Sequence, residues 1–165
     1  MAGEPTRMIP SVAELQGSLL KAGRGLGLSL GVAEDIAAAA PFFLAADELN
    51  ETLAQLLREM ESGRVTQVIE AIDAALCDGK VEITDSRAAR ALVASASYRA
   101  QRVVILKAGH VVAQEPAKSA KPLPRRKMID DALWDRLQEF AARTYVPASD
   151  ASREKGAGAG LTDND

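Results

Sequence analysis

Residues 47–79, with the sequence DELNETLAQLLREMESGRVTQVIEAIDAALCDG, decide the helical part of the fold. Apolar side chains recur at every third or fourth position on both sides of Gly63, which is the period of one helix face. The first run contains Leu49, Leu53, Leu56, Leu57 and Met60, and the second contains Val65, Val68, Ile69, Ile72 and Leu76. We predict two amphipathic helices, at about 47–62 and 65–77, that pack as an antiparallel pair.

Two further helices are predicted upstream of this pair. Ser11-Val12-Ala13-Glu14 is a capping-box pattern that opens a helix, and this helix should stop at Gly23. Ser29 is the expected N-cap of the next helix, and Pro41 should kink or end it because proline has no backbone N–H. The N-terminal part is therefore expected to be mainly helical, with about four helices.

The hydrophobic period changes downstream of Gly79. Residues 81–84 alternate as a strand does, and Asp85 or Ser86 can cap a helix that runs to about Ala100. Residues 103–106 read as a buried strand, 108–109 as a hairpin turn and 111–113 as its returning strand, before a last helix at about 130–143. We predict an α+β fold in which a small mixed sheet has a right-handed crossover helix, followed by a C-terminal helix and an extended tail.

The composition is that of a single globular domain. The chain has 165 residues, of which 47% are hydrophobic and 26% are charged. We assign residues 1–147 to one compact domain, which includes a proline-rich basic segment at 115–128, and residues 148–165 to a glycine-rich tail. Cys77 is the only cysteine, which excludes a disulfide-stapled secreted fold. The N-terminus carries acid and proline instead of an apolar run, so we expect a soluble, cytoplasmic protein with no membrane partner.

The charge distribution argues against a nucleic-acid partner. The 20 basic and 23 acidic residues are interspersed, and the formal net charge is −3. Basic residues gather only in the 115–128 segment, as Lys118, Lys121, Arg125, Arg126 and Lys127. This run could contact phosphates, but it has no interleaved aromatic side chains and contains prolines, so a solvated loop explains it better.

Two glycine-containing segments near the ends of the chain carry a family resemblance. They are LLKAGRGLGLSLGVAED at residues 19–35 and LWDRLQEFAARTYVPASDASREKGAGAGLTDND at residues 133–165. Together they resemble the ends of an uncharacterised bacterial family, domain of unknown function 3726. The run YVPASDASR followed by GAGAG is the most specific part of the likeness. The resemblance implies an α-then-α/β layout, and it brings no assigned activity.

The first of these segments contains a candidate anion site at residues 23–27. A dinucleotide-binding fingerprint is a poor match, because a helix precedes this loop and the spacing is GxGxG. A helix C-cap followed by a turn accounts for the glycines. The functional alternative is that Lys21, Arg24 and Gly25 hold a carboxylate or phosphate beside the N-terminus of the next helix.

The tail contains the second candidate anion site. Its proposed ligand-binding residues are Arg153, Gly156, Gly158, Gly160 and Asp163. Composition alone describes a flexible terminus. The alternative is an ordered nest in which glycine amides and the Arg153 guanidinium bind an anion. Because the family resemblance includes both glycine segments, we expect them to meet in space and form one site.

Metal and nucleophile chemistry find little support in the sequence. His110 is the only histidine, and neither it nor Cys77 has a partner at CxxC or HxxxH spacing, so no metal site is predicted. A hard cation at Asp163-Asn164-Asp165 would lack pre-organisation. There is no GxSxG motif, and acidic pairs such as Asp130-Asp131 are explained by helix starts.

The sequence favours a non-enzymatic binding or accessory protein. We expect it to recognise a small anionic ligand or a protein partner near the 23–27 turn and the tail. The alternative is an enzyme or enzyme subunit that acts on a small anionic metabolite through Arg24, Arg153 and the glycine amides. Homo-oligomerisation through the alanine-rich residues 37–46 is a third hypothesis, and no cofactor can be assigned.

Overall fold

The computed structural model describes residues 8–102, 104–113 and 121–144. Within these ranges the protein has seven α-helices and one three-stranded sheet, which confirms the predicted helix-rich α+β class. The helices are α1 (Val12–Gly25), α2 (Leu30–Ala38), α3 (Ala40–Ala45), α4 (Leu49–Glu61), α5 (Arg64–Asp78), α6 (Arg87–Ala100) and α7 (Asp131–Ala142). The strands are β1 (Lys80–Glu82), β2 (Val104–Lys107) and β3 (His110–Ala113).

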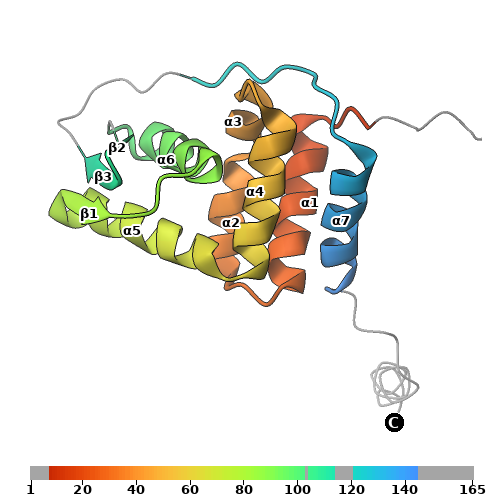
Figure 1. The fold of residues 1–165 in the computed structure, drawn as a ribbon, viewed down its shortest axis with the longest axis horizontal. Coiled ribbons are helices and arrows are strands. Elements are labelled where there is room, and N and C mark those ends of the chain that lie inside the picture. Colours follow the sequence, from red (N-terminus) through yellow and green to blue (C-terminus); the bar gives the residue numbers. More distant parts are fainter. Residues whose placement is uncertain (1–7, 103, 114–120, 145–165) are drawn as a thin grey trace, which may run out of the picture.

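Four helices, α1, α2, α4 and α7, stand roughly parallel to one another in one part of the molecule (Figure 1). Within this group α1 packs most extensively against α2 and α7. The last helix therefore returns to the first one and closes the fold. Its start is held in place because the Ile129 N–H donates to the Met8 carbonyl at 2.9 Å. The Asn50 side chain adds to this, since it exchanges two hydrogen bonds of 3.1 Å with Asp130.

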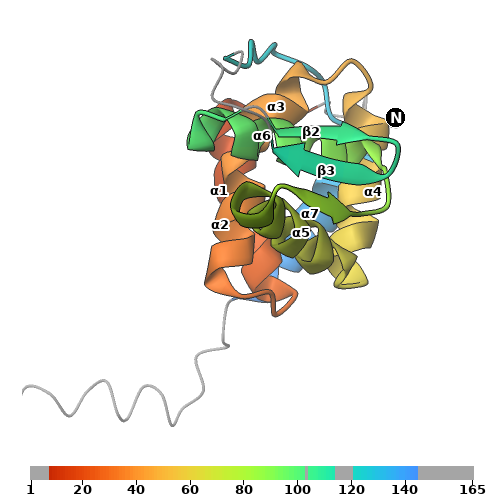
Figure 2. The same cartoon turned by 90° about the vertical axis from the view of Figure 1, so that its left-hand side faces the viewer.

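The second part of the molecule contains α5, α6 and the sheet (Figure 2). β3 is the central strand of the order β1-β3-β2, and it pairs antiparallel with both neighbours. Val111 lies opposite Val81 on one side and Leu106 on the other. The predicted mixed sheet is therefore wrong in its pairing, because β3 folds back after the turn at Ala108 and Gly109 and separates β1 from β2.

The predicted antiparallel packing of α4 and α5 is also wrong. The two helices form close to the predicted bounds, but after Gly63 the chain turns so that α5 runs across α4 (Figures 1 and 2). The apolar face of α5 is shared among α4, α6 and the sheet, and α4 takes only part of it. The periodic pattern identified the buried faces, but it contained no information on which element each face covers.

Serine residues cap three of the helices as the sequence predicts. The Glu14 N–H donates to Ser11 Oγ at 3.2 Å and the Ser11 N–H donates to the Glu14 carboxylate at 2.7 Å, which is a complete capping box. Ser29 and Ser86 accept hydrogen bonds from the first turns of α2 and α6. Pro41 lies in the first turn of α3, and α2 ends before it, at Ala38.

One continuous apolar core joins the two parts. Its largest fully buried side chains include Phe43 of α3, Leu56 of α4, Leu92 of α6 and Phe140 of α7. The core is built mainly from aliphatic and alanine side chains, as the low aromatic content requires. Within the described ranges, no helix has both the length and the apolar character needed to cross a membrane.

Candidate functional site

The glycines of the 23–27 segment terminate α1 and allow its close packing. α1 continues to Gly25, two residues beyond the predicted stop, and Gly27 then adopts a left-handed conformation with φ +81°. The Leu28 N–H donates to the Gly23 carbonyl and the Gly27 N–H to the Arg24 carbonyl, both at 3.0 Å. This is the hydrogen-bond pattern of a Schellman C-cap. The amides of Gly27 and Leu28 are therefore already occupied by the helix end.

Close helix approaches explain the other two glycines. A Cβ atom at Gly23 would lie 2.9 Å from the Cβ of Ala33 on α2. At Gly25 it would lie 1.9 Å from the backbone oxygen of Phe140 on α7. Both glycines thus let α1 approach its neighbours more closely than any side chain would permit.

The remaining residues of the predicted anion site lie as follows. Lys21 is exposed on α1. Arg24 is exposed too, and its Nη1 donates to the Leu28 carbonyl at 2.9 Å across the turn. The tail residues Arg153, Gly156, Gly158, Gly160 and Asp163 lie outside the described residues. An anion site formed by both segments therefore stays a prediction.

A surface hollow of about 730 Å³ lies between α4, α5 and the segment that contains β1. Its lining is mostly polar and comprises Gln55, Glu59, Arg64, Gln67, Val68, Glu82, Ile83, Thr84 and Ser86. We call it the Glu59 hollow. In this hollow Glu59 of α4 lies near residues 82–86, which follow α5 in the chain. The two segments can meet because α5 crosses α4 (Figure 1).

Glu59 is the unusual side chain of this hollow. It is only 7% exposed, and its Oε2 is buried with no hydrogen-bond partner among the described residues. Burial raises the pKa of the Glu59 carboxyl above its ordinary value of 4.5, although the Ser86 hydroxyl, Arg64 and Arg58 each lower it in part. Because Glu59 belongs to the lining of the hollow, a bound molecule that reaches this carboxyl can donate a hydrogen bond to the oxygen that has no partner among the described residues.

The neighbours of Glu59 are held in place by bonds of their own. Gln55 Oε1 accepts from the Arg87 N–H at 3.0 Å, which ties α4 to the start of α6. Ser86 is buried as the N-cap of α6, and its Oγ accepts from the Ala89 N–H at 3.0 Å. Arg87 also pairs with Glu48 of the loop before α4. These bonds fix the positions of Gln55 and Ser86 in the wall of the hollow.

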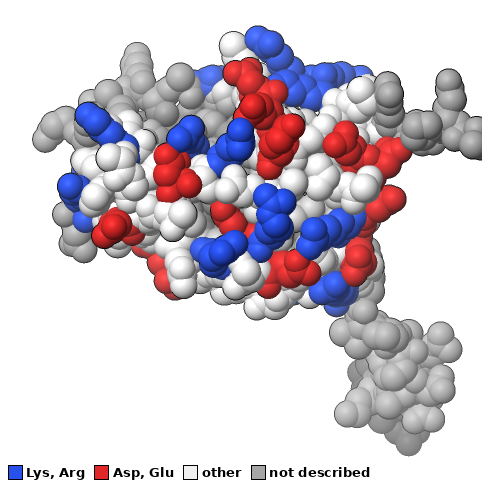
Figure 3. Space-filling view, in the orientation of Figure 1, with Lys and Arg blue, Asp and Glu red and all other residues white. Residues whose placement is uncertain are grey.

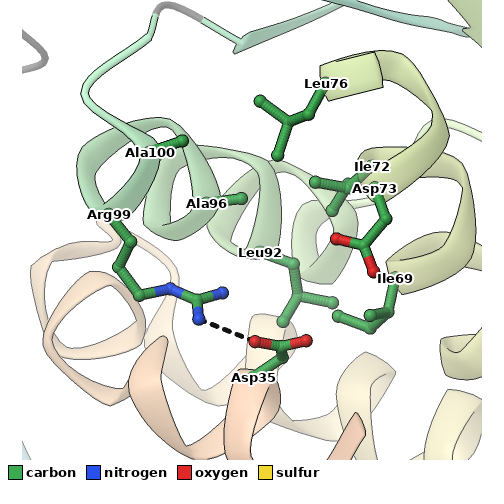
Figure 4. Close-up of a pocket in the computed structure, with 9 residues that line it drawn as sticks. All are labelled: Asp35, Ile69, Ile72, Asp73, Leu76, Leu92, Ala96, Arg99 and Ala100. Atoms are coloured by element: carbon green, nitrogen blue, oxygen red, sulfur yellow. Dashed lines mark hydrogen bonds and ion pairs between the residues drawn. The ribbon is translucent and has the colours of Figure 1, made fainter. Parts of the chain in front are cut away.

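A second, smaller hollow of about 250 Å³ lies between α2, α5 and α6 (Figure 4). Its floor is apolar and includes Ile69, Ile72 and Leu92. Arg99 Nη1 donates to Asp35 Oδ1 at 2.7 Å, and the Asp73 carboxylate points into the same space from α5. Partial desolvation beside the apolar floor raises the pKa of Asp73, the negative charge of Asp35 raises it further, and Arg99 lowers it. Because Asp35 already has its cation and Asp73 is exposed, an interhelical ion cluster accounts for this second hollow.

Charges of both signs are mixed over the face of the molecule shown in Figure 3. Lys and Arg side chains gather along its upper edge, where residues 121–130 cross the molecule (Figures 1 and 3). Part of this basic run holds the segment down, because the Arg125 N–H donates to the Leu44 carbonyl and Lys127 Nζ to the Ala46 carbonyl.

Metal-binding clusters are absent from the part of the chain that the structure describes. Cys77 is exposed at the end of α5. His110 begins β3, and its Nδ1 lies 3.0 Å from the carbonyl oxygen of Ala108 in the hairpin turn.

Glu59 was not among the candidate residues identified from the sequence, although a signal for it exists. It lies three residues after Leu56 and seven after Thr52, so it continues a buried helical face. A carboxyl group at such a position is exceptional in an amphipathic helix. Ser86 was predicted only as a helix cap, because nothing in the sequence places it beside α4.

The chain matches no protein-family model, and no curated protein and no solved structure shows significant similarity to it. The resemblance of its two end segments to the uncharacterised family stays a prediction.

Proposed function

We propose that this chain is a non-enzymatic binding protein that holds a small polar molecule in the Glu59 hollow. The observation that carries the proposal is the buried Oε2 of Glu59, which has no hydrogen-bond partner among the described residues. A buried polar atom left in this state costs about 1–3 kcal/mol. A ligand that donates a hydrogen bond to it would recover part of that free energy on binding.

The position of Glu59 supports this reading over a purely structural one. A structural carboxyl inside a protein is normally paired with a cation or with several donors. Neither Arg58 nor Arg64 forms an ion pair with Glu59 within the described ranges, although both are close enough to lower the pKa of its carboxyl. Local violations of packing rules of this kind are expected at functional sites.

The broader inferences from sequence belong to the same proposal. They are a cytoplasmic location and membership of the uncharacterised bacterial family. Anion or partner binding by the 23–27 turn together with the tail would be a separate function. Its turn glycines already have structural roles, so we place the principal ligand site at the Glu59 hollow.

A ligand screen read by two-dimensional amide NMR tests this function. The screen should cover small amines, amino acids, sugars, alcohols and carboxylates, with the full-length protein labelled with nitrogen-15. We expect at least one class to shift the amide signals of Gln55, Glu59 and Ser86 in a saturable way. Glu59→Ala should abolish the shifts, whereas Glu51→Ala, at an exposed position of the same helix, should preserve them. If no class perturbs the hollow, the proposed function is wrong.

The raised pKa of Glu59 also favours a second candidate, an enzyme that uses this carboxyl as a general acid or base. Arg64 on the wall of the hollow could then hold an anionic substrate. The same NMR samples separate the two functions. A binding protein leaves the spectrum of its ligand unchanged over hours, whereas an enzyme converts it.

A further inference from the structure

We infer that the Glu59 hollow selects a small protonated amine, one that has N–H donors on its cationic nitrogen. This inference rests on the proposed function and adds the chemical class of the ligand. It follows from the hydrogen-bonding state and the charge of the groups that line the hollow.

Two of the hydrogen-bond acceptors that line the hollow are already occupied. Gln55 Oε1 already accepts from the Arg87 N–H, and Ser86 Oγ accepts from the Ala89 N–H. Glu59 Oε2 is buried and accepts no hydrogen bond from the described residues. The Ser86 hydroxyl lowers the pKa of this carboxyl as a hydrogen-bond donor to it, so the unmet requirement is for one further donor, at Oε2.

The charges of the lining also bear on which ligand the hollow can hold. The ionisable groups that line the hollow are two carboxyls, Glu59 and Glu82, and one guanidinium, Arg64. When these three lining groups are ionised, the lining carries one negative charge in excess, and Arg58, which lies outside the lining, offsets part of it. A cation is favoured by this excess, and an anion would be repelled by Glu59 in a partly desolvated place. The anionic ligand predicted from the sequence concerns a different site, the 23–27 turn and the tail.

A protonated amine differs from other hydrogen-bond donors and from other cations because it is both a donor and a cation. A neutral alcohol can donate a hydrogen bond to Glu59 but does not compensate the negative charge of the carboxylate. A hydrogen bond between two charged groups is also stronger, because a charge-assisted hydrogen bond is about twice as strong as a neutral one. A quaternary ammonium compensates the charge but has no N–H to donate. The apolar side chains of Val68 and Ile83 line the same hollow and can contact the carbon chain of an alkylamine.

The test is an NMR titration with four probes that share a butyl chain: butylammonium, butyltrimethylammonium, butanol and butyrate. We expect butylammonium to bind the full-length protein at about pH 7, where the amine is protonated. Its dissociation constant should be smaller than that of each other probe by about tenfold or more, given the usual value of a hydrogen bond to a charged group. The amide signals of Gln55, Glu59 and Ser86 should report the binding.

Two variants make the result specific. Glu59→Gln keeps the shape of the side chain and removes its charge, so it should weaken butylammonium binding by about tenfold. Glu51→Gln removes an equivalent charge from an exposed site on α4 and should leave the affinity unchanged. An unchanged affinity in Glu59→Gln would overturn the inference.

The same experiment separates this inference from the proposed function. If butanol, butyrate or butyltrimethylammonium binds the hollow as tightly as butylammonium, the hollow is a ligand site and only the amine selectivity is wrong. If none of the four probes binds, but another class in the wider screen does, the amine inference again fails alone. Only the absence of any ligand in the hollow removes both proposals.

Discussion

Glu59 occupies a position in α4 where an apolar side chain would pack. It continues the buried face formed by Thr52 and Leu56, and its own side chain is nearly inaccessible to solvent. The carboxyl therefore loses much of its hydration on folding without gaining a full set of hydrogen bonds. The native state is therefore less stable than it would be with a neutral side chain at position 59.

Replacing Glu59 by glutamine should make the protein more stable at neutral pH. The change keeps the volume and removes a buried charge, so the free energy of unfolding should rise by on the order of 1 kcal/mol. Thermal melts followed by circular dichroism measure this. The matched variant Glu51→Gln, at an exposed position, should change the melting temperature little. A large loss of stability in Glu59→Gln would show that the charge has a structural partner.

The gain should also depend on pH in a defined direction. The pKa of Glu59 is higher in the folded state than its ordinary value of 4.5, so above that value the folded state binds more protons than the unfolded state. The contribution of Glu59 to the free energy of unfolding therefore falls as the pH rises from about 4.5 through the folded-state pKa of its carboxyl. The charged groups around it are Arg58, Arg64 and Glu82. The advantage of Glu59→Gln should therefore be small in acid and grow towards neutral pH.

The C-terminal end of α1 shows how a single glycine controls the packing of two helices. Gly25 lies against the last turn of α7, and the nearest atom to a Cβ there would be a backbone oxygen, which cannot rotate away. Accommodating any side chain would require α1 and α7 to separate. These two helices make one of the most extensive contacts in the fold.

Gly25→Ala should therefore destabilise the protein by about 1–3 kcal/mol, the usual cost of overpacking. Gly17→Ala is the control, because it lies in the same helix and a Cβ there would meet nothing within 4 Å. It should raise stability by about 0.5–1 kcal/mol, since alanine is the better helix former. Urea unfolding midpoints measure both changes. Equal effects of the two substitutions would contradict the close approach of α1 and α7.

Much of the element level could be predicted from the sequence. Apolar periodicity located the helices, and Ser11, Ser29 and Ser86 marked three of their starts, because these signals are local. The predicted stop at Gly23 was wrong because a glycine can serve either as a helix end or as a close contact. The position of α2 shows that Gly23 allows a close contact between α1 and α2 and does not end the helix.

The Glu59 hollow could not be predicted, because it depends on how distant segments meet. Glu59 and Ser86 lie on elements separated by α5 and β1, and their proximity requires α5 to cross α4. The sequence favoured an antiparallel pair instead, and in that arrangement these two side chains have no reason to meet. The antiparallel pairing of β1 with β3 was missed for a similar reason. Strand pairing across a long connection is decided by the whole fold.

At the scale of the whole molecule, the two parts share one core. Its buried apolar residues form a single cluster that contains side chains of both the α1–α7 pair and α6. The closing helix α7 contains Trp134, the only tryptophan, which packs against this core. Leu92 of α6 belongs to the same cluster at the other part of the molecule, next to α5.

We therefore expect the described fold to unfold in one cooperative transition. The fluorescence of Trp134 reports on α7, while far-ultraviolet circular dichroism reports on all helices, and the two should give the same melting temperature. Leu92→Ala should lower the melting temperature measured by both probes to the same extent. The substitution leaves a cavity in the shared core, which costs about 2–5 kcal/mol of stability. If the two parts were independent, this substitution would shift the circular dichroism transition in part and leave the Trp134 transition in place. Such a separation would mean that α5, α6 and the sheet can unfold while α1 and α7 stay paired, and that the Glu59 hollow can be lost before the rest of the protein.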